Sequence, residues 1–149
     1  MPTGCMMAAA VCAALAPGSL NDISKTPGAV RTKDVAVICH TKTSSVRNVP
    51  ASVRKQVFAS YRMTNKTGWC GKAGCELDHL VSLELGGSND ASNLWPQPYA
   101  GRWNAHHKDR LENRLHKLIC TGRITPAAAQ AAISRDWIFA YQKYVGSVQ

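Results

Sequence analysis

The chain has 149 residues, of which 45% are hydrophobic, so its composition excludes an intrinsically disordered protein and its length suits one domain with a modest core. Lys and Arg number 18 against 9 Asp and Glu, which gives a formal net charge of +9. This excess favours a polyanionic partner, most simply nucleic acid, over a basic surface that binds nothing.

The N-terminal residues 1–21 carry no charged side chain, and Cys5 to Ala16 is an apolar run. The run has about the length of the apolar core of an export signal, and Ala14-Leu15-Ala16 resembles a cleavage site. Against this, no Lys or Arg precedes the run, and Pro17 would be a poor first residue of a mature chain. The segment is therefore either an export signal or a disordered tail, and its length does not predict a membrane span.

Residues 17–34 are rich in Pro, Gly, Ser, Thr and Lys, which is typical of a linker, so residues 1–34 precede a domain that spans residues 35–149. The first segment of that domain, Val35–Cys39, is short, β-branched and apolar and predicts a strand or an extended segment. Ser52 is a suitable cap for a helix that ends near Tyr61, because apolar residues recur every four positions along it.

The central apolar segment, Leu77–Leu85, predicts a single strand. Gly86-Gly87 follows it and permits the positive φ angles of a tight turn. Ser88–Trp95 is then expected to be a loop or a short second strand.

Two helices are expected in the last third of the chain. The first begins at Asn104 and ends near Gly122, because its leucines and isoleucine follow a helical period. The second begins at Thr125-Pro126, with Thr as the cap and Pro in the first turn, and runs through Trp137 to Tyr144.

Six cysteines, an even number, favour an oxidising compartment, so export is the alternative to a cytoplasmic location. Cys70 and Cys75 are near enough in sequence to close a short loop, and Cys39 and Cys120 could join the two ends of the domain. The other two cysteines lie in the apolar N-terminal run. The alternative is that Cys70 and Cys75 bind zinc. However, a structural zinc site usually has four ligands, and only one close pair of cysteines is present.

An adjacent Asp and His in the central segment suit the hydrolysis of a phosphodiester, which needs a base to activate water and a cation to neutralise charge. A neutral imidazole, His79, suits the base, and the carboxylate of Asp78 suits a hard divalent ion. Neighbours on a strand point to opposite faces, so a twist at the strand end would be needed for both to reach one site. Asn93 could accept the second imidazole N–H or could fix the loop that does so.

These residues form a pattern that resembles the HNH endonuclease family. The pattern consists of Asp78-His79, Leu83-Glu84-Leu85-Gly86-Gly87-Ser88-Asn89-Asp90 and Asn93-Leu94-Trp95-Pro96. It also resembles a bacterial subgroup of HNH-type proteins in which Lys108-Asp109, Glu112 and Cys120 follow, so the similarity runs from about Val35 to Tyr144.

The resemblance implies an α+β protein with a small ββα-metal core (the HNH or His-Me finger) and additional flanking helices. It implies that Asp78 binds one divalent ion (Mg²⁺, Mn²⁺ or Zn²⁺), that His79 is the general base and that Asn93 is the middle residue of the motif. The last metal ligand of the family lies on the following helix, where His106 is the first candidate and His107 the second. The usual cysteine pairs of the family are missing, which favours disulfides over structural zinc.

Several basic side chains on or before this helix either line a nucleic-acid groove or remain solvated surface charges. They are Arg102, Lys108, Arg110 and Arg114. Glu112 is expected in an ion pair rather than on the metal.

The sequence thus predicts a metal-dependent endonuclease that hydrolyses phosphodiester bonds in nucleic acid, with DNA favoured over RNA as the substrate, and without a small-molecule cofactor or stable membrane insertion. One alternative is a non-catalytic nucleic-acid-binding module with a nuclease-like fold. The other is an exported interaction protein held together by disulfides.

Overall fold

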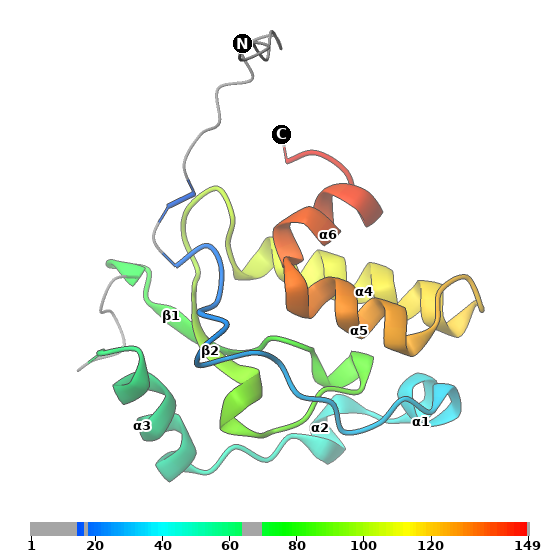
Figure 1. The fold of residues 1–149 in the computed structure, drawn as a ribbon, viewed down its shortest axis with the longest axis horizontal. Helices are drawn as coiled ribbons and strands as arrows, with labels where there is room; N and C mark the ends of the chain where they lie inside the picture. The colour runs from blue at the N-terminus through cyan, green and yellow to red at the C-terminus, as the bar shows by residue number, and fades with distance from the viewer. Residues whose placement is uncertain (1–14, 17, 64–69, 149) are drawn as a thin grey trace, which may run out of the picture.

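The computed structural model describes residues 15–16, 18–63 and 70–148, so the predicted export signal or tail lies almost entirely outside the described residues. A small sheet packs against a group of C-terminal helices (Figure 1), which confirms the α+β class. The strands are β1 (Cys75–His79) and β2 (Leu94–Pro98). The helices are α1 (Val35–His40), α2 (Thr43–Val46), α3 (Ala51–Ser60), α4 (Ala105–Cys120), α5 (Pro126–Arg135) and α6 (Trp137–Tyr144).

The two strands pair in antiparallel register, with Asp78 opposite Trp95 and His79 opposite Leu94. The predicted strand over Leu77–Leu85 is wrong beyond His79, because the chain leaves the sheet there and forms a short 3-10 helix at Leu83–Leu85. The strand ladder cannot continue, because the main-chain N–H and C=O of Val81 bond instead to the side chain of Asn93.

Gly86-Gly87 does not form a tight hairpin turn, since a long loop, residues 80–93, joins the strands. Gly86 ends the 3-10 helix with a φ of 85°, a left-handed conformation that favours glycine. At Gly87 a Cβ atom would collide with the carbonyl of Val81. The two glycines therefore fold the loop tightly back on itself rather than reverse the strand.

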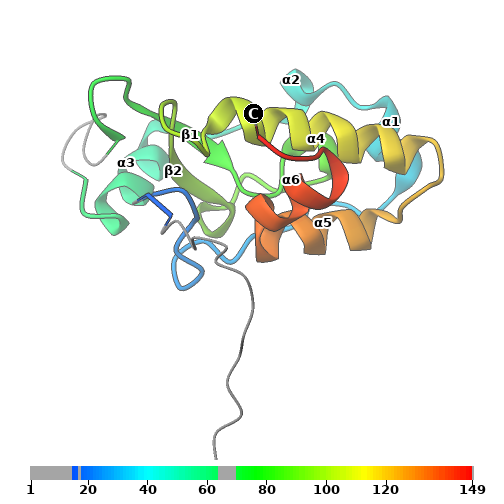
Figure 2. The ribbon, with the colours of Figure 1, turned by 90° about the horizontal axis from the view of Figure 1, so that it is seen from above.

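The helix predicted from Asn104 to Gly122 is confirmed as α4, which Asn104 caps by accepting the N–H groups of His106 and His107. It lies between α6 and α5 on one side and α1 on the other (Figure 2). The apolar stripe of α4 is buried in the core with the aromatic side chains of Trp95, Trp103 and Trp137.

The last predicted helix begins as expected, with Thr125 as its cap and Pro126 in its first turn, but it is two helices. Asp136 ends α5 and caps α6 by accepting the N–H of Phe139. An Asp side chain that bonds a main-chain N–H competes with a continuous helix, which is why the chain breaks at this position.

The predicted strand at Val35–Cys39 is wrong, because this segment forms α1. Asp34 caps it by accepting the N–H of Val37. Ile38 is the buried residue of α1. β-Branched side chains favour a strand only weakly where no neighbouring strand is available to pair with. The helix predicted near Ser52 is confirmed as α3, although Pro50 rather than Ser52 occupies the cap position.

The segment interpreted as a linker is part of the folded domain in its described portion, residues 18–34. Trp137 donates its indole N–H to Ser19 O, and Thr26 donates its hydroxyl to Leu94 O. The main-chain N–H groups of Arg31 and Thr32 both donate to the carbonyl of Gly86. The domain therefore begins before residue 35.

Two disulfides lie within the described ranges and match the predicted pairings. Cys39–Cys120 joins α1 to the last residue of α4 with a Cα–Cα distance of 5.8 Å, and Cys70–Cys75 closes a short loop before β1 with a distance of 5.5 Å. Disulfides are typical of oxidising compartments, which favours export. Among the helices of the described ranges, none is long and apolar enough to cross a membrane.

The two disulfides close loops of very different length, 81 residues for Cys39–Cys120 and 5 for Cys70–Cys75. From the chain entropy alone, we expect the double Ser variant of the long bridge to lose about 4.5 kcal/mol of unfolding free energy and that of the short bridge about 2 kcal/mol. Urea unfolding of both variants measures this. A larger loss for the Cys70 and Cys75 variant would contradict it.

Candidate functional site

His79 is the last residue of β1 and is 5% exposed. Its Nε2 lies 3.0 Å from Oδ1 of Asn89. The Asn89 amide is oriented by its other contacts, because its Nδ2 donates to Val46 O and its Oδ1 accepts the main-chain N–H of Asn48. An amide oxygen cannot donate, so the hydrogen-bond network assigns the proton to Nε2 of His79 and leaves the lone pair on Nδ1.

Burial lowers the pKa of His79, although the bond to Asn89 and the charge of Asp78 act in the opposite direction. The imidazole is therefore neutral at neutral pH. A neutral imidazole with a fixed tautomer and its lone pair on Nδ1 has the state that a general base requires.

Asn93 is fully buried and holds the loop rather than the imidazole. Its Oδ1 accepts the N–H groups of Ala29 and Val81, and its Nδ2 donates to the carbonyls of Val81 and Ser88. Ser88 directly precedes Asn89. Of the two alternatives for Asn93, these contacts correspond to the second, in which it fixes the loop that orients His79.

Asp78 is buried between β2 and α4. Its Oδ2 accepts the indole N–H of Trp95 at 3.1 Å and lies 2.7 Å from Nζ of Lys108. Lys108 also donates to Glu112 Oε1 at 2.5 Å and to the main-chain carbonyl of His79 at 2.8 Å. With 0% exposure, Lys108 cannot reach a phosphate, so its assignment to a nucleic-acid surface is wrong. Glu112 is in an ion pair, as predicted.

The charges of this buried group are balanced internally. Burial alone would lower the pKa of Lys108, but the neighbouring Asp78 and Glu112 raise it above its usual value, so the ammonium stays charged. Burial raises the pKa of Glu112 to about 8. Asp78 and Glu112 both pair with the ammonium of Lys108.

The predicted metal ligands do not come together. His106 is exposed on the first turn of α4, with its ring 6.2 Å from that of Tyr99. His107 lies instead in an aromatic cluster with Trp103 and Tyr141, where its Nδ1 is buried without a partner. Asp78 already pairs with a buried lysine, so these three residues do not form a ligand set in this arrangement.

A different group in the described part of the chain could hold a metal ion: Cys39, His116 and Cys120, whose donor atoms all lie within 4.8 Å of one another. The two sulfur atoms form a disulfide in this structure, and Nε2 of His116 lies 3.7 Å from the sulfur of Cys120. This group was not predicted as a metal site. The signal was present, because a His and a Cys four positions apart share one face of a helix.

The three predicted phosphate-binding arginines are exposed, and they lie on α4 or in the loop before it, whereas His79 ends β1. Arg102 is in the loop before α4. Arg110 lies 5.9 Å from the ring centre of Tyr141, and Arg114 donates to the carbonyl of Tyr144. Arg110 and Arg114 are therefore on the α6 side of α4, whereas Lys108 reaches toward β1.

Two further carboxyl groups interact electrostatically with Asp78, and neither was predicted as a site residue. Burial, with the charges of Asp78 and Asp109, raises the pKa of Glu76 to about 7. Burial and the charge of Asp78 also raise the pKa of Asp109. Glu76 could have been found from the alternation of a strand, because it shares a face with the residue two positions later.

Arg47 and Asn89 were also missed as site residues. Arg47 is exposed and lies between Val46 and Asn48, whose main-chain groups both bond to Asn89. Its charge contributes to lowering the pKa values of both His79 and Glu76. No sequence pattern connects this short segment with the central motif, since about forty residues separate them.

Comparisons of the chain with protein-family models, with curated proteins and with solved structures found no match.

The raised pKa of Glu76 makes the stability of the metal-free protein depend on pH. The carboxyl of the folded chain holds its proton up to about pH 7, against 4.5 for the ordinary value, so stability falls as the pH rises through this window. After allowance for solvent screening, Glu76→Gln is expected to be about 1 kcal/mol more stable than the wild type above pH 7 and equally stable below 4.5. Urea unfolding in EDTA tests this, and equal stability at both pH values would contradict it.

Proposed function

We propose that this chain is an HNH-like, metal-dependent endonuclease that hydrolyses phosphodiester bonds, in DNA rather than in RNA. The observation that carries the proposal is the state of His79: the last residue of a β-strand, neutral, with its Nε2 proton held by Asn89. The succession of β1, a long loop, β2 and α4 is consistent with the ββα arrangement that the sequence resemblance implies.

In the proposed reaction, Nδ1 of His79 accepts a proton from the attacking water. The Asn89 oxygen keeps the Nε2 proton in place, so the imidazole does not have to change tautomer before it acts. Lys108 bonds to the main-chain carbonyl of His79 and thereby fixes the end of β1 relative to α4. The chain itself thus supplies an oriented base on a rigid support.

The site for a divalent ion needs a ligand set that differs from the predicted one. Asp78 with His106 and His107 does not fit, because His107 is packed among aromatic rings and Asp78 is neutralised by Lys108. The chemistry of a hard cation suits the carboxylates of Glu76 and Asp109, whose pKa values are raised by burial and by the charge of Asp78. A bound divalent ion would neutralise charge on the scissile phosphate and on the leaving oxygen.

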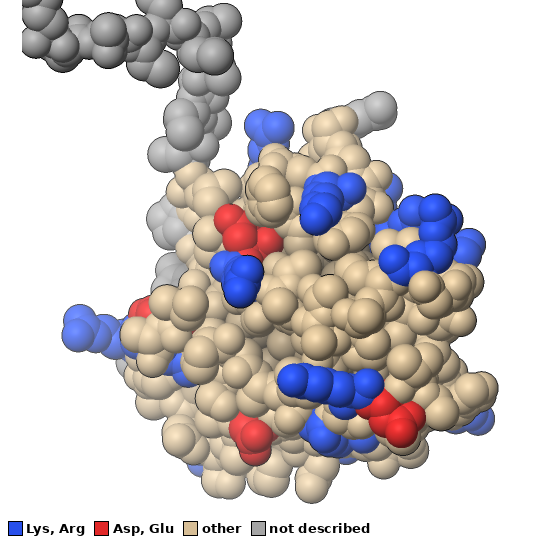
Figure 3. All heavy atoms as spheres, turned by 45° about the vertical axis from the view of Figure 1, so that its right-hand side comes forward, with Lys and Arg blue, Asp and Glu red and all other residues tan. Residues whose placement is uncertain are grey.

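The distribution of charge supports a nucleic-acid substrate. On the face drawn in Figure 3, basic side chains are spread widely and acidic side chains are few. Arg47 is the basic residue best placed to contact the scissile phosphate, because its neighbours hold Asn89 and its charge reaches His79. The disulfides are compatible with a secreted nuclease.

One observation favours a second candidate, a nucleic-acid-binding module without activity. The carboxylate of Asp78 already pairs with Lys108. Among the described residues, no group of three possible metal ligands includes either Asp78 or His79. Such a module would keep the basic surface and bind phosphates without cleaving them.

Plasmid cleavage by the purified chain tests the function, with Mg²⁺, Mn²⁺ or Zn²⁺ and with EDTA. We expect metal-dependent cleavage that falls by at least about 100-fold in His79→Ala, because a general base is lost. His40→Ala is the matched control, since His40 is an exposed histidine on α1, and it should cleave like the wild type. DNA binding that weakens with salt but brings no cleavage with any metal would identify the inactive module.

The role of Asn89 is tested separately by Asn89→Ala. Loss of the amide oxygen frees the imidazole to rotate and to change tautomer, so we expect the rate of cleavage to fall by about 10- to 100-fold while DNA affinity is retained. Asn48→Ala is the control, because only the main-chain N–H of Asn48 contacts Asn89. Unchanged cleavage by Asn89→Ala would remove the assigned tautomer from the mechanism.

A further inference from the structure

The group formed by Cys39, His116 and Cys120 lies at the far end of α4 from Asn104 and plays no part in the proposed hydrolysis. His116 and Cys120 are one helical turn apart on α4, and Cys39 is brought to them by α1. Nε2 of His116 lies 3.2 Å from the carbonyl of Ile38, the residue before Cys39. The side chains of three separate positions thus converge at this end of α4.

Two thiolates and an imidazole are the ligands that zinc and similar transition metals prefer, and hard ions such as Mg²⁺ do not. The three donor atoms already lie within 4.8 Å of one another. In a tetrahedral site the sulfur atoms stand about 2.3 Å and the nitrogen about 2.0 Å from zinc. Opening the sulfur–sulfur bond and turning the imidazole away from Ile38 O would bring all three to such a centre.

We propose that Cys39, His116 and Cys120 form a redox-dependent metal site: a disulfide when oxidised, and a three-ligand site for Zn²⁺ when reduced. The disulfide and the metal exclude each other, because both use the same two sulfur atoms. Each connects α1 to the end of α4, so the metal replaces the covalent link. The proposal does not rest on the nuclease function.

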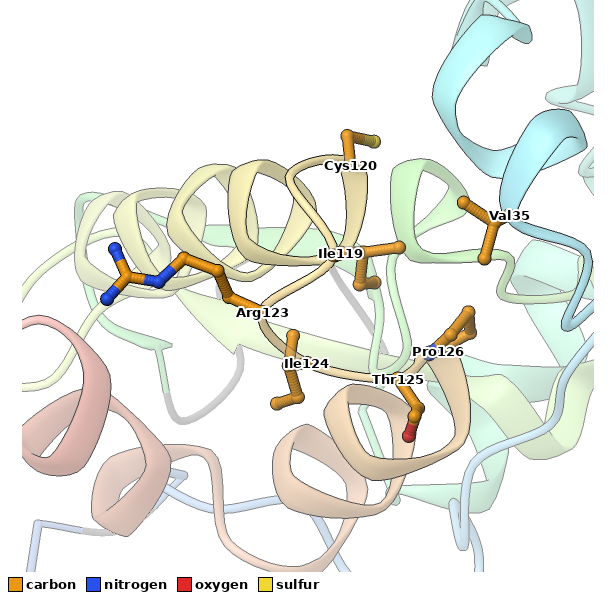
Figure 4. A pocket seen from close by; sticks show the side chains of 8 residues that line it. Val35, Ile119, Cys120, Arg123, Ile124, Thr125 and Pro126 are labelled. Carbon is orange, nitrogen blue, oxygen red and sulfur yellow. The ribbon is translucent and has the colours of Figure 1, made fainter.

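The fourth position of the proposed site is open to solvent. Cys120 is exposed, and a hollow of about 460 Å³ lies beside it, lined also by Val35, Ile119 and Arg123. In Figure 4 the sulfur of Cys120 lies on the side of α4 that faces Val35 and α1. A water molecule can therefore complete the coordination, as in zinc sites with three protein ligands.

The conversion balances with a phosphine as the reductant. The phosphine attacks one sulfur and breaks the sulfur–sulfur bond, two thiols form with hydrogen from one water molecule, and the phosphine leaves as its oxide. Zn²⁺ then binds the two sulfur atoms as thiolates, and two protons are released to solvent. Affinity should consequently increase with pH, because the ligands must be deprotonated.

Titration with Co²⁺ as a spectroscopic probe tests the proposal on the full-length chain with Cys5, Cys12, Cys70 and Cys75 replaced by Ser. The phosphine-reduced chain should bind one Co²⁺, with thiolate charge-transfer bands and a tetrahedral spectrum that Zn²⁺ abolishes. The oxidised chain should show neither band. Circular dichroism of each sample records whether the chain is folded.

His116→Ala is the decisive variant and should weaken binding by at least about tenfold, the loss found even for groups that only support metal ligands. His40→Ala is the matched control, because His40 adjoins Cys39 in sequence but its Nδ1 lies 2.8 Å from Ala36 O on its own helix. His116→Ala in the oxidised state shows whether the variant folds. Absence of Co²⁺ binding by the reduced chain, equal binding by His116→Ala, or binding by the oxidised chain would each overturn the proposal.

Discussion

The buried ammonium of Lys108 connects the two parts of the molecule on which the candidate site depends. A lone charge in the core would be strongly unfavourable, but this one is surrounded by Asp78, Glu112 and the carbonyl of His79. Its partners come from a strand and from its own helix, so the ion pair forms only when β1 and α4 are correctly docked. These contacts of Lys108 position the end of β1 and therefore the imidazole of His79.

Two asparagines hold the loop between the strands in place with their side-chain hydrogen bonds. Asn93 satisfies four main-chain groups: three inside the loop, at Val81 and Ser88, where backbone atoms have no ladder partner, and the N–H of Ala29. Asn89 then links the loop to the segment around Arg47 and holds the imidazole of His79. The loop contains little regular structure, and amide side chains provide the hydrogen bonds that a sheet would otherwise supply.

The sequence predicts the helices that have strong local signals. It does not predict the segments whose structure depends on contacts between residues far apart in the chain. The apolar period marked the helix that starts at Asn104, and the Thr125 cap marked the next helix start, because both signals are local. Val35–Cys39 was mistaken for a strand, since no local signal shows that a partner strand is absent. His79 could be singled out from its motif, but the burial of Lys108 and the contact from residues 46–48 depend on the tertiary structure. The two cysteine pairings that spacing and position suggest are both present.

The bridge between Cys39 and Cys120 has a topological consequence for proteolysis. Every residue of the hairpin, its loop and α4 lies between these two cysteines, so the whole candidate site sits inside one covalent ring. A protease that cuts a single peptide bond within the ring leaves both pieces joined and the ends of the cut held near each other. The protein could therefore tolerate a nick that would release half of an unbridged chain.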